Sequence, residues 1–251
     1  MQKPMRIERH GSVALLRLES GKVNAIGPAF VAGLNQLLDG LADANAAVVT
    51  GQGSVFSAGL DLPALIDLDP AAMQRFMEEF NALMLRLFEL PIPLVAAING
   101  HAIAGGCVLA LQADLRLAAD RESRLGLNEA QLGLGLPAVV LETLRCQVPG
   151  SSLSPIALEG RLFSPREALQ LGLVHEVVPE AGLVQKALER AQALAQLAPA
   201  GVRQIKAALR RPVAESIRAV SAADSQRWVA SWLDPASQAR LRAAVARLRK
   251  S

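Results

Sequence analysis

The chain has 251 residues, enough to bury a substantial core in one large domain or in one domain with a helical appendage. Hydrophobic residues make up 51% of it but aromatic residues only 3%, so the core should consist mainly of alanine and aliphatic side chains. The net charge of +3 is a small basic excess, which argues against nucleic acid as a partner.

The cysteine, histidine and hydropathy patterns exclude further classes of protein. Cys107 and Cys146 are too few for a disulfide framework and lack the spaced partners of a zinc site. The histidines at positions 10, 101 and 175 show no metal-like spacing either. No uncharged stretch is long enough to span a bilayer. We therefore expect a cytoplasmic protein that binds neither a metal ion nor a membrane.

The amino-terminal part predicts a hairpin, a helix and a buried strand. Residues 5–10 and 13–18 have the pattern of two short strands separated by a turn. A loop then leads to Pro28, which suits the first turn of a helix ending near Asp39. The apolar run at 46–50 is typical of a buried strand.

The middle of the chain continues this alternation. A helix is predicted from Pro70 to about residue 90, because apolar residues recur there with a helical period. Residues 93–98 predict another buried strand, and Gly105 begins the next helix. Long crossovers between such strands favour an α/β fold with a parallel sheet, in which ligands bind at the carboxyl ends of the strands.

The carboxyl-terminal part is expected to be helical after a short extended piece. A capping box at 164–167 predicts a helix that Gly172 would end, followed by an extended segment at 173–179. From residue 183 onward the pattern is helical. Pro199, Pro212 and Pro235 are expected to separate helices near 183–197, 201–210, 213–232 and 235–250.

Two glycine turns and one glutamate are the candidates for chemistry. The turns lie at 56–62 (FSAGLDL) and 103–107 (IAGGC), and Glu129 ends the segment 126–129 (GLNE). Two backbone N–H groups that point at one position would stabilise an oxyanion, and a nearby carboxylate could move a proton. Partial burial would raise the pKa of Glu129 toward the range of a general base. Together these features favour enolate chemistry on a thioester.

Each feature also has a structural explanation. Glycine turns are common where strands and helices pack closely, and this accounts for either turn when it is taken alone. Glu129 would also fit the first turn of a helix capped by Asn128. The combination of the three segments favours the functional interpretation.

These segments, in this order, resemble the crotonase superfamily, also called the enoyl-CoA hydratase/isomerase family. The resemblance covers nearly the whole chain and implies an α/β spiral of repeated ββα units at 1–182, which holds the acyl-CoA site. It also implies a C-terminal helical region at 183–251 that assembles a homotrimer or a dimer of trimers. By this resemblance Glu129 is the catalytic acid–base residue, and Leu60 and Gly105 are the oxyanion-hole donors. Coenzyme A would enter as part of the substrate, with no further cofactor.

The resemblance also concerns the type of reaction. Hydratases of this family use two glutamates, and Val108 stands where the first would lie. A valine cannot hold or deprotonate water, whereas one base suffices to move a proton between the alpha and gamma carbons of an enoyl thioester. The chain therefore looks like a Δ3,Δ2-enoyl-CoA isomerase, which implies fatty-acid β-oxidation. An enoyl-CoA hydratase or other crotonase-type lyase is one alternative, and a catalytically weak CoA-binding subunit is another.

The resemblance further suggests which residues contact the substrate. Arginines at 240, 242, 247 and 249 would meet CoA phosphates or, more simply, form a solvated or oligomer face. The proline at the end of 133–137 is spaced unlike the usual hydratase pattern, so the preferred acyl length stays open. The residues placed against the substrate are Val23, Ala25, Ala58, Gly59, Leu60, Asp61, Leu62, Gly105 and Asn128.

Overall fold

A six-stranded sheet lies at the centre of the protein, whose computed structural model describes residues 5–249. In order across the sheet, its strands are β1 (Arg6–His10), β2 (Val13–Arg17), β3 (Ala46–Thr50), β5 (Leu94–Ile98), β7 (Leu115–Asp120) and β9 (Glu176–Pro179). β1 and β2 form the predicted antiparallel hairpin, and the later neighbours pair in parallel. The expected α/β architecture is thus confirmed.

A second, smaller sheet carries the segments that the sequence singled out. Its three short parallel strands are β4 (Val55–Ser57), β6 (His101–Ile103) and β8 (Leu125–Gly126). The first glycine turn follows β4, the second follows β6, and Glu129 comes shortly after β8. Because parallel strands end at the same edge of a sheet, this sheet brings the three segments together.

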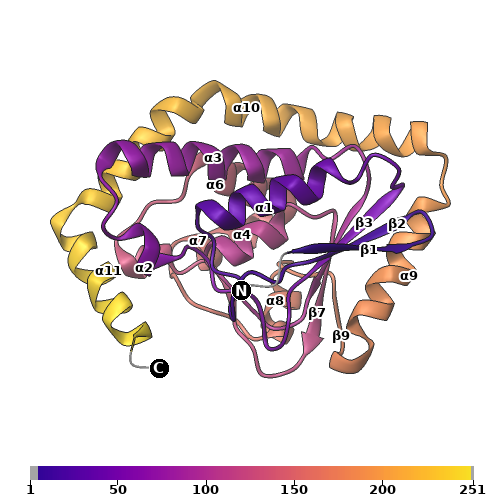
Figure 1. Cartoon of the computed structure of the whole chain (residues 1–251), viewed down its shortest axis with the longest axis horizontal. Helices are drawn as coiled ribbons and strands as arrows, with labels where there is room; N and C mark the ends of the chain where they lie inside the picture. The colour runs from indigo at the N-terminus through magenta and orange to yellow at the C-terminus, as the bar shows by residue number, and fades with distance from the viewer. Residues whose placement is uncertain (1–4, 250–251) are drawn as a thin grey trace.

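Helices cover both faces of the main sheet. Figure 1 shows α3 and α10 lying along each other, which agrees with their close packing, while α9 lies against the opposite face of the sheet. No helix within the described residues is both long and apolar enough to cross a membrane. The helices are α1 (Pro28–Asp39), α2 (Leu62–Leu65), α3 (Pro70–Phe88), α4 (Gly105–Leu111), α5 (Glu129–Leu132), α6 (Ala138–Gln147), α7 (Leu153–Ala157), α8 (Pro165–Gln170), α9 (Leu183–Ala195), α10 (Pro199–Leu233) and α11 (Pro235–Leu248).

Two apolar cores result from this layering. The larger one fills the space between the sheet and the helices α1, α3, α4, α6 and α10. The smaller one is formed where Leu183, Ala187 and Leu188 of α9 meet Val48 and Val95 of the sheet. Apolar side chains therefore point to both faces of the central strands, as the continuous apolar runs in the sequence predicted.

One prediction for the carboxyl-terminal helices is wrong. Pro212 does not separate two helices, because α10 is continuous over 35 residues and contains it. A proline inside a helix costs about 3 kcal/mol. Packing of α10 on α3 and α6 offsets this cost, and two ion pairs hold the preceding turns, since Lys206 and Arg210 bind Asp114 at 2.6 and 2.8 Å. Pro199 and Pro235 do mark helix starts, as expected.

Candidate active site

The first glycine turn is fastened to the loop before α1. Asn24 is buried with a positive φ of 49°, and its Nδ2 donates to the carbonyl oxygen of Phe56 at 3.0 Å. The main-chain nitrogen of Ala58 donates to Val23 O at 3.0 Å, which holds the loop against the turn. Val23 and Ala25 therefore flank the turn, but neither side chain lines the cavity described below.

The two glycine turns touch each other. A Cβ atom added to Gly59, which has a φ of +85°, would lie 2.7 Å from Ile103 O and 3.1 Å from Gly105 N. Ala104, just before Gly105, has a φ of 49°, an unfavourable conformation for alanine that costs about 1–3 kcal/mol. Such strain is retained where the surrounding structure requires it, and it is concentrated at functional sites.

Two backbone donors are left free by this arrangement. Gly105 is the first residue of α4, so its N–H has no partner within the helix. Within the described residues, neither the N–H of Leu60 nor that of Gly105 has a hydrogen-bond acceptor. Asp61 is engaged differently, because its Oδ1 accepts from Ala64 N and caps α2. The turns thus supply two unsatisfied donors that lie side by side.

Glu129 brings a carboxyl group to the same place. Its Oε2 is inaccessible to solvent and has no hydrogen-bond partner in the part of the chain that the structure describes, although the residue as a whole is only half-buried. Burial raises the pKa of Glu129 from 4.5 to about 7. Glu129 begins α5 and Asn128 occupies the N-cap position, as the structural alternative expected, but the Asn128 side chain makes no capping hydrogen bond. Its Oδ1 is buried and has no partner among the described residues. Both side chains therefore present unpaired acceptors.

A cavity of about 100 Å³ connects these groups. Apart from Asn128 and Glu129, the residues around it are apolar, and Val108 of α4 is among them. Of the predicted contacts, Gly59 and Asp61 lie beside the cavity without lining it. The lining residues are Ala58, Leu60, Leu62, Met77, Phe80, Ile103, Ala104, Gly105, Val108, Asn128, Glu129, Leu132, Leu134, Pro137, Val140 and Trp228.

The loop after Glu129 is held by the carboxyl-terminal helices. Trp228 Nε1 of α10 donates to Gly135 O at 3.0 Å, and the Asp224 carboxylate of the same helix accepts from Ala138 N at 2.6 Å. Ser237 Oγ of α11 donates to Gly133 O at 2.9 Å. Sequence reasoning did not predict these contacts, because they join segments roughly a hundred residues apart. These contacts hold the loop that contributes Leu134 and Pro137 to the cavity wall.

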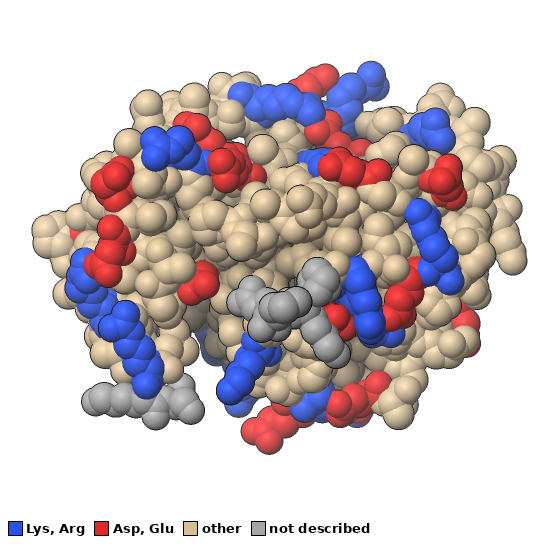
Figure 2. Space-filling model, in the orientation of Figure 1, with Lys and Arg blue, Asp and Glu red and all other residues tan. Residues whose placement is uncertain are grey.

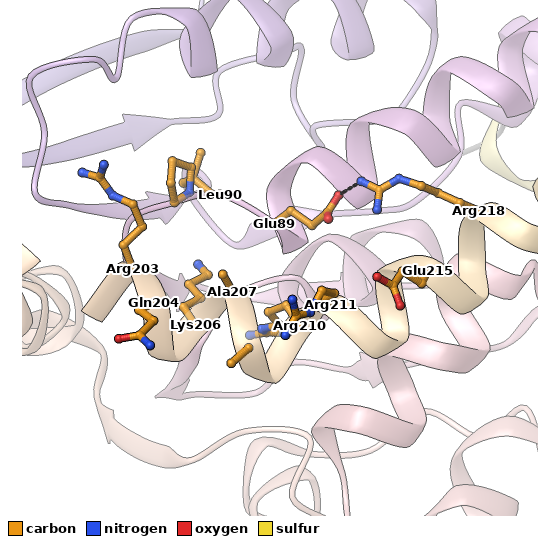
Figure 3. Close-up of a pocket in the computed structure, with 12 residues that line it drawn as sticks. Glu89, Leu90, Arg203, Gln204, Lys206, Ala207, Arg210, Arg211, Glu215 and Arg218 are labelled. Carbon is orange, nitrogen blue, oxygen red and sulfur yellow. Dashed lines mark hydrogen bonds and ion pairs between the residues drawn. The ribbon is translucent and has the colours of Figure 1, made fainter. Parts of the chain in front are cut away.

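A larger hollow lies elsewhere, between the end of α3 and the first half of α10 (Figure 3). Its volume is about 580 Å³, and charged side chains line it. Most of these charges already have partners, because Arg218 pairs with Glu89 while Lys206 and Arg210 bind Asp114. Neither the two glycine turns nor Glu129 line this hollow. This hollow exceeds the cavity beside Glu129 in volume, but the arrangement of reactive groups favours the smaller cavity.

The surface adds little to the choice of ligand. Figure 2 shows basic and acidic side chains interspersed on the face in view, without a continuous basic area. On α11, Arg242 pairs with Asp67 at 2.9 Å. That arginine therefore has an acidic partner within the chain, in line with the simpler interpretation of the helix as a solvated face.

Comparison with known proteins places the chain in a family. The paired sheets, the two glycine turns and the glutamate with a buried carboxyl oxygen define a crotonase-type acyl-CoA enzyme, and the family model for enoyl-CoA hydratase/isomerase matches residues 8–237. The chain therefore belongs to the enoyl-CoA hydratase/isomerase family, as its sequence motifs predicted.

Both sequence relatives and solved structures are substantially similar to this chain. It is 36% identical to human mitochondrial enoyl-CoA delta isomerase 1 over 226 residues, covering 86% of this chain and 74% of the relative. It is 37% identical to a putative enoyl-CoA hydratase of Thermus thermophilus over 203 residues, covering 78% and 79%. The crystal structure of human mitochondrial Δ3-Δ2-enoyl-CoA isomerase superposes with a TM-score of 0.95, at 31% identity and 99% coverage of both chains. The predicted crotonase fold is thereby confirmed.

Proposed function

We propose that this enzyme is a Δ3,Δ2-enoyl-CoA isomerase that uses Glu129 as its only acid–base residue. The observation that carries the proposal is a single buried carboxyl with a pKa of about 7, in a cavity that is otherwise apolar except for Asn128. A pKa near neutrality suits a group that must both take and return a proton. Val108 offers no second carboxylate, which favours proton transfer over the addition of water.

The first step is removal of a proton. The Glu129 carboxylate takes it from C2 of a 3-enoyl thioester, and the C–H electron pair delocalises over the neighbouring double bond and the carbonyl group. This gives a dienolate with negative charge on the thioester oxygen. The N–H groups of Leu60 and Gly105 donate to that oxygen, and each donor of this kind contributes about 2.7–4 kcal/mol to transition-state stabilisation.

The second step returns a proton to the substrate. Protonated Glu129 delivers it to C4, a double bond forms between C2 and C3, and the carbonyl group is restored. The product is a 2-enoyl thioester, and the enzyme regains its carboxylate. No atom is gained or lost, so neither a cofactor nor a second substrate is needed.

Isotope exchange and mutation test this assignment. We expect wild-type protein to convert 3-hexenoyl-CoA to the conjugated product, followed by its absorbance, and to incorporate deuterium from heavy water. Glu129→Gln should lower kcat by about 10²–10⁴-fold. Glu79→Gln, which removes an exposed carboxyl on α3, is the matched control and should retain wild-type turnover. A folded Glu129→Gln variant with full turnover would show that the base is a different group.

Hydration of a 2-enoyl-CoA is a second candidate activity. Within residues 5–249, Asn128 Oδ1 and Glu129 Oε2 are both buried acceptors without a partner, and two to four polar partners suffice to hold one water molecule. The putative hydratase of Thermus thermophilus named above is also similar to this chain. Hydration of crotonyl-CoA that is lost in Asn128→Ala, while isomerisation is retained, would support this second candidate. Tight CoA binding without any turnover would instead support the catalytically weak subunit.

Assembly, compartment and pathway belong to the same proposal. We infer that residues 183–251 assemble a homotrimer or a dimer of trimers around cores formed by 1–182, with Ile205 and Leu209 exposed on α10 as apolar contacts. Light scattering during gel filtration would measure the mass. The cytoplasm and a role in fatty-acid β-oxidation rest on the unpaired cysteines and the family resemblance, and fractionation of the native host would test the compartment.

A further inference from the structure

The cavity beside Glu129 has an accessible mouth and a closed end. At the mouth, Ala58 is exposed and Leu62 and Leu132 are half-buried. The far wall comes from α3, α4, α6 and α10 and is almost completely buried. Its side chains are Met77 (1% exposed), Phe80 (3%), Val108 (1%), Val140 (2%) and Trp228 (5%).

Trp228 is fixed in the wall that closes this end. Its indole Nε1 donates to Gly135 O at 3.0 Å, so the ring is tied to the loop that follows Glu129. The ring also stacks on Trp232, with centroids 5.5 Å apart and an interplanar angle of 27°. Moving Trp228 aside would break a partly buried hydrogen bond and an aromatic contact together, so the wall resists displacement by a longer ligand.

The volume sets a limit on what fits. At about 100 Å³ the cavity is smaller than the apolar void of about 150 Å³ that admits a six-carbon benzene ring. Leu60 and Gly105 also line it, so the same space must hold the thioester carbonyl. An acyl chain bound with its carbonyl at these donors therefore has room for only a few further carbons.

We propose that this site selects acyl-CoA thioesters with short chains of about four to six carbons, and that Trp228 is the residue that sets the limit. The inference rests on the proposed function only in taking an acyl-CoA as the ligand. It does not depend on which atom Glu129 deprotonates. Trp228 acts here by excluding volume and takes no part in proton transfer.

A binding series with saturated acyl-CoAs tests the limit without any turnover. Titration calorimetry on the full chain would use acetyl-, butyryl-, hexanoyl-, octanoyl- and decanoyl-CoA. Each methylene that finds apolar space should raise affinity about fourfold. We expect affinity to rise up to hexanoyl-CoA and then to level off or fall. In Trp228→Ala the rise should continue to octanoyl-CoA or beyond.

Two further variants separate pocket size from general weakening of the core. Met77→Ala enlarges the same end of the cavity from α3. In this variant too, affinity should keep rising beyond hexanoyl-CoA. Phe88→Leu truncates a fully buried side chain of α3 that does not line the cavity, and should keep the wild-type series. Thermal unfolding of each variant would establish that it is folded before its series is interpreted.

The outcomes are distinguishable. Affinity that keeps rising through decanoyl-CoA in the wild type would overturn the proposed limit. An unchanged series in both folded cavity variants would overturn the assignment to this wall. If no acyl-CoA binds at all, the proposed function itself fails. Short-chain binding with the expected series, but without isomerisation, would leave this inference standing and reject only the reaction.

Discussion

Gly59 and Gly105 approach each other so closely that a Cβ atom on Gly59 would lie 3.1 Å from the main-chain nitrogen of Gly105. The same atom would lie 2.7 Å from Ile103 O, closer than real Cβ atoms come to backbone. Glycine at position 59 is therefore a condition for placing the N–H groups of Leu60 and Gly105 side by side. The positive φ of Gly59 is a second reason, because side-chain-bearing residues rarely adopt it.

Gly59→Ala should accordingly impair catalysis strongly. The added methyl group must push the two turns apart, and displacement of one oxyanion donor costs about 10²–10³ in kcat. We expect this loss with 3-hexenoyl-CoA, together with a decrease of about 1–2 kcal/mol or more in the free energy of unfolding from the backbone conformation. Steady-state kinetics and urea unfolding would measure both.

Gly53 provides the matched control. It also has a positive φ, of 57°, but a Cβ atom there would meet no atom of the described residues within 4 Å. Gly53→Ala should therefore show a similar backbone cost of about 1–2 kcal/mol with unchanged turnover. Equal turnover in both variants would show that the contact between the two turns does not matter for the reaction.

Most strands of the main sheet were predicted from the sequence, whereas β7 (Leu115–Asp120) and the small sheet were not. The runs 46–50 and 93–98 are long and apolar enough to identify buried strands, and the predicted strands and starts of α1 and α3 are confirmed. β4, β6 and β8 contain only two or three residues each, too few for an alternating pattern to be recognised. Yet these strands are what aligns the two turns with Glu129.

The residues that form the walls of the site could not be predicted from the sequence either. Trp228 reaches the cavity from α10, far along the chain from Glu129, and no local pattern links the two. Pro212 suggested a break in that helix, because local propensity is visible in a sequence while packing against α3 and α6 is not. The motifs therefore predicted the chemical groups, and the tertiary contacts determine the volume that surrounds them.

The raised pKa of Glu129 predicts a stability that falls with pH. The folded protein binds this proton more tightly than the unfolded chain, whose carboxyl has a pKa of 4.5. The contribution is thus fully present below pH 4.5 and is lost as pH rises through about 7. Glu129→Gln does not titrate, so its stability relative to wild type should increase across this interval by up to about 3 kcal/mol.

Urea unfolding at about pH 5 and about pH 8 would measure this difference. Glu79→Gln, which changes an exposed carboxyl on α3, should keep the pH dependence of the wild type. A difference between Glu129→Gln and wild type that stays constant with pH would contradict the raised pKa. The activity of the wild type should rise over the same pH interval, because the base must be ionised to take the proton.

The two cysteines should differ sharply in reactivity. Cys107 is buried, and burial together with the nearby Glu129 charge raises the pKa of its thiol from 9.0 to about 12. The thiolate is the reactive form, so its fraction falls roughly a thousandfold. Cys146 is exposed. We expect a thiol reagent to label one cysteine rapidly in the native protein and two after denaturation, and Cys146→Ser should abolish the rapid phase. Rapid labelling in that variant would show that Cys107 is accessible.

Asp114 should be essential for stability because it neutralises two buried cations. Its carboxylate accepts from Lys206 at 2.6 Å, from Arg210 at 2.8 Å and from the main-chain nitrogen of Leu94 at 2.8 Å. Burial lowers the pKa of Lys206, which shows how poorly its charge is solvated. Asp114→Asn would leave both cations unpaired and should cost about 3–5 kcal/mol in urea unfolding.

The exposed pair between Asp67 and Arg242 is the control for this last prediction. Their side chains are 72% and 57% exposed, and such surface pairs contribute about 0–1 kcal/mol. Asp67→Asn should therefore leave the free energy of unfolding within about 1 kcal/mol of wild type. If Asp114→Asn proved equally mild, α10 would be held in place by its apolar contacts alone. The ion pairs before Pro212 could then not explain why that helix stays continuous.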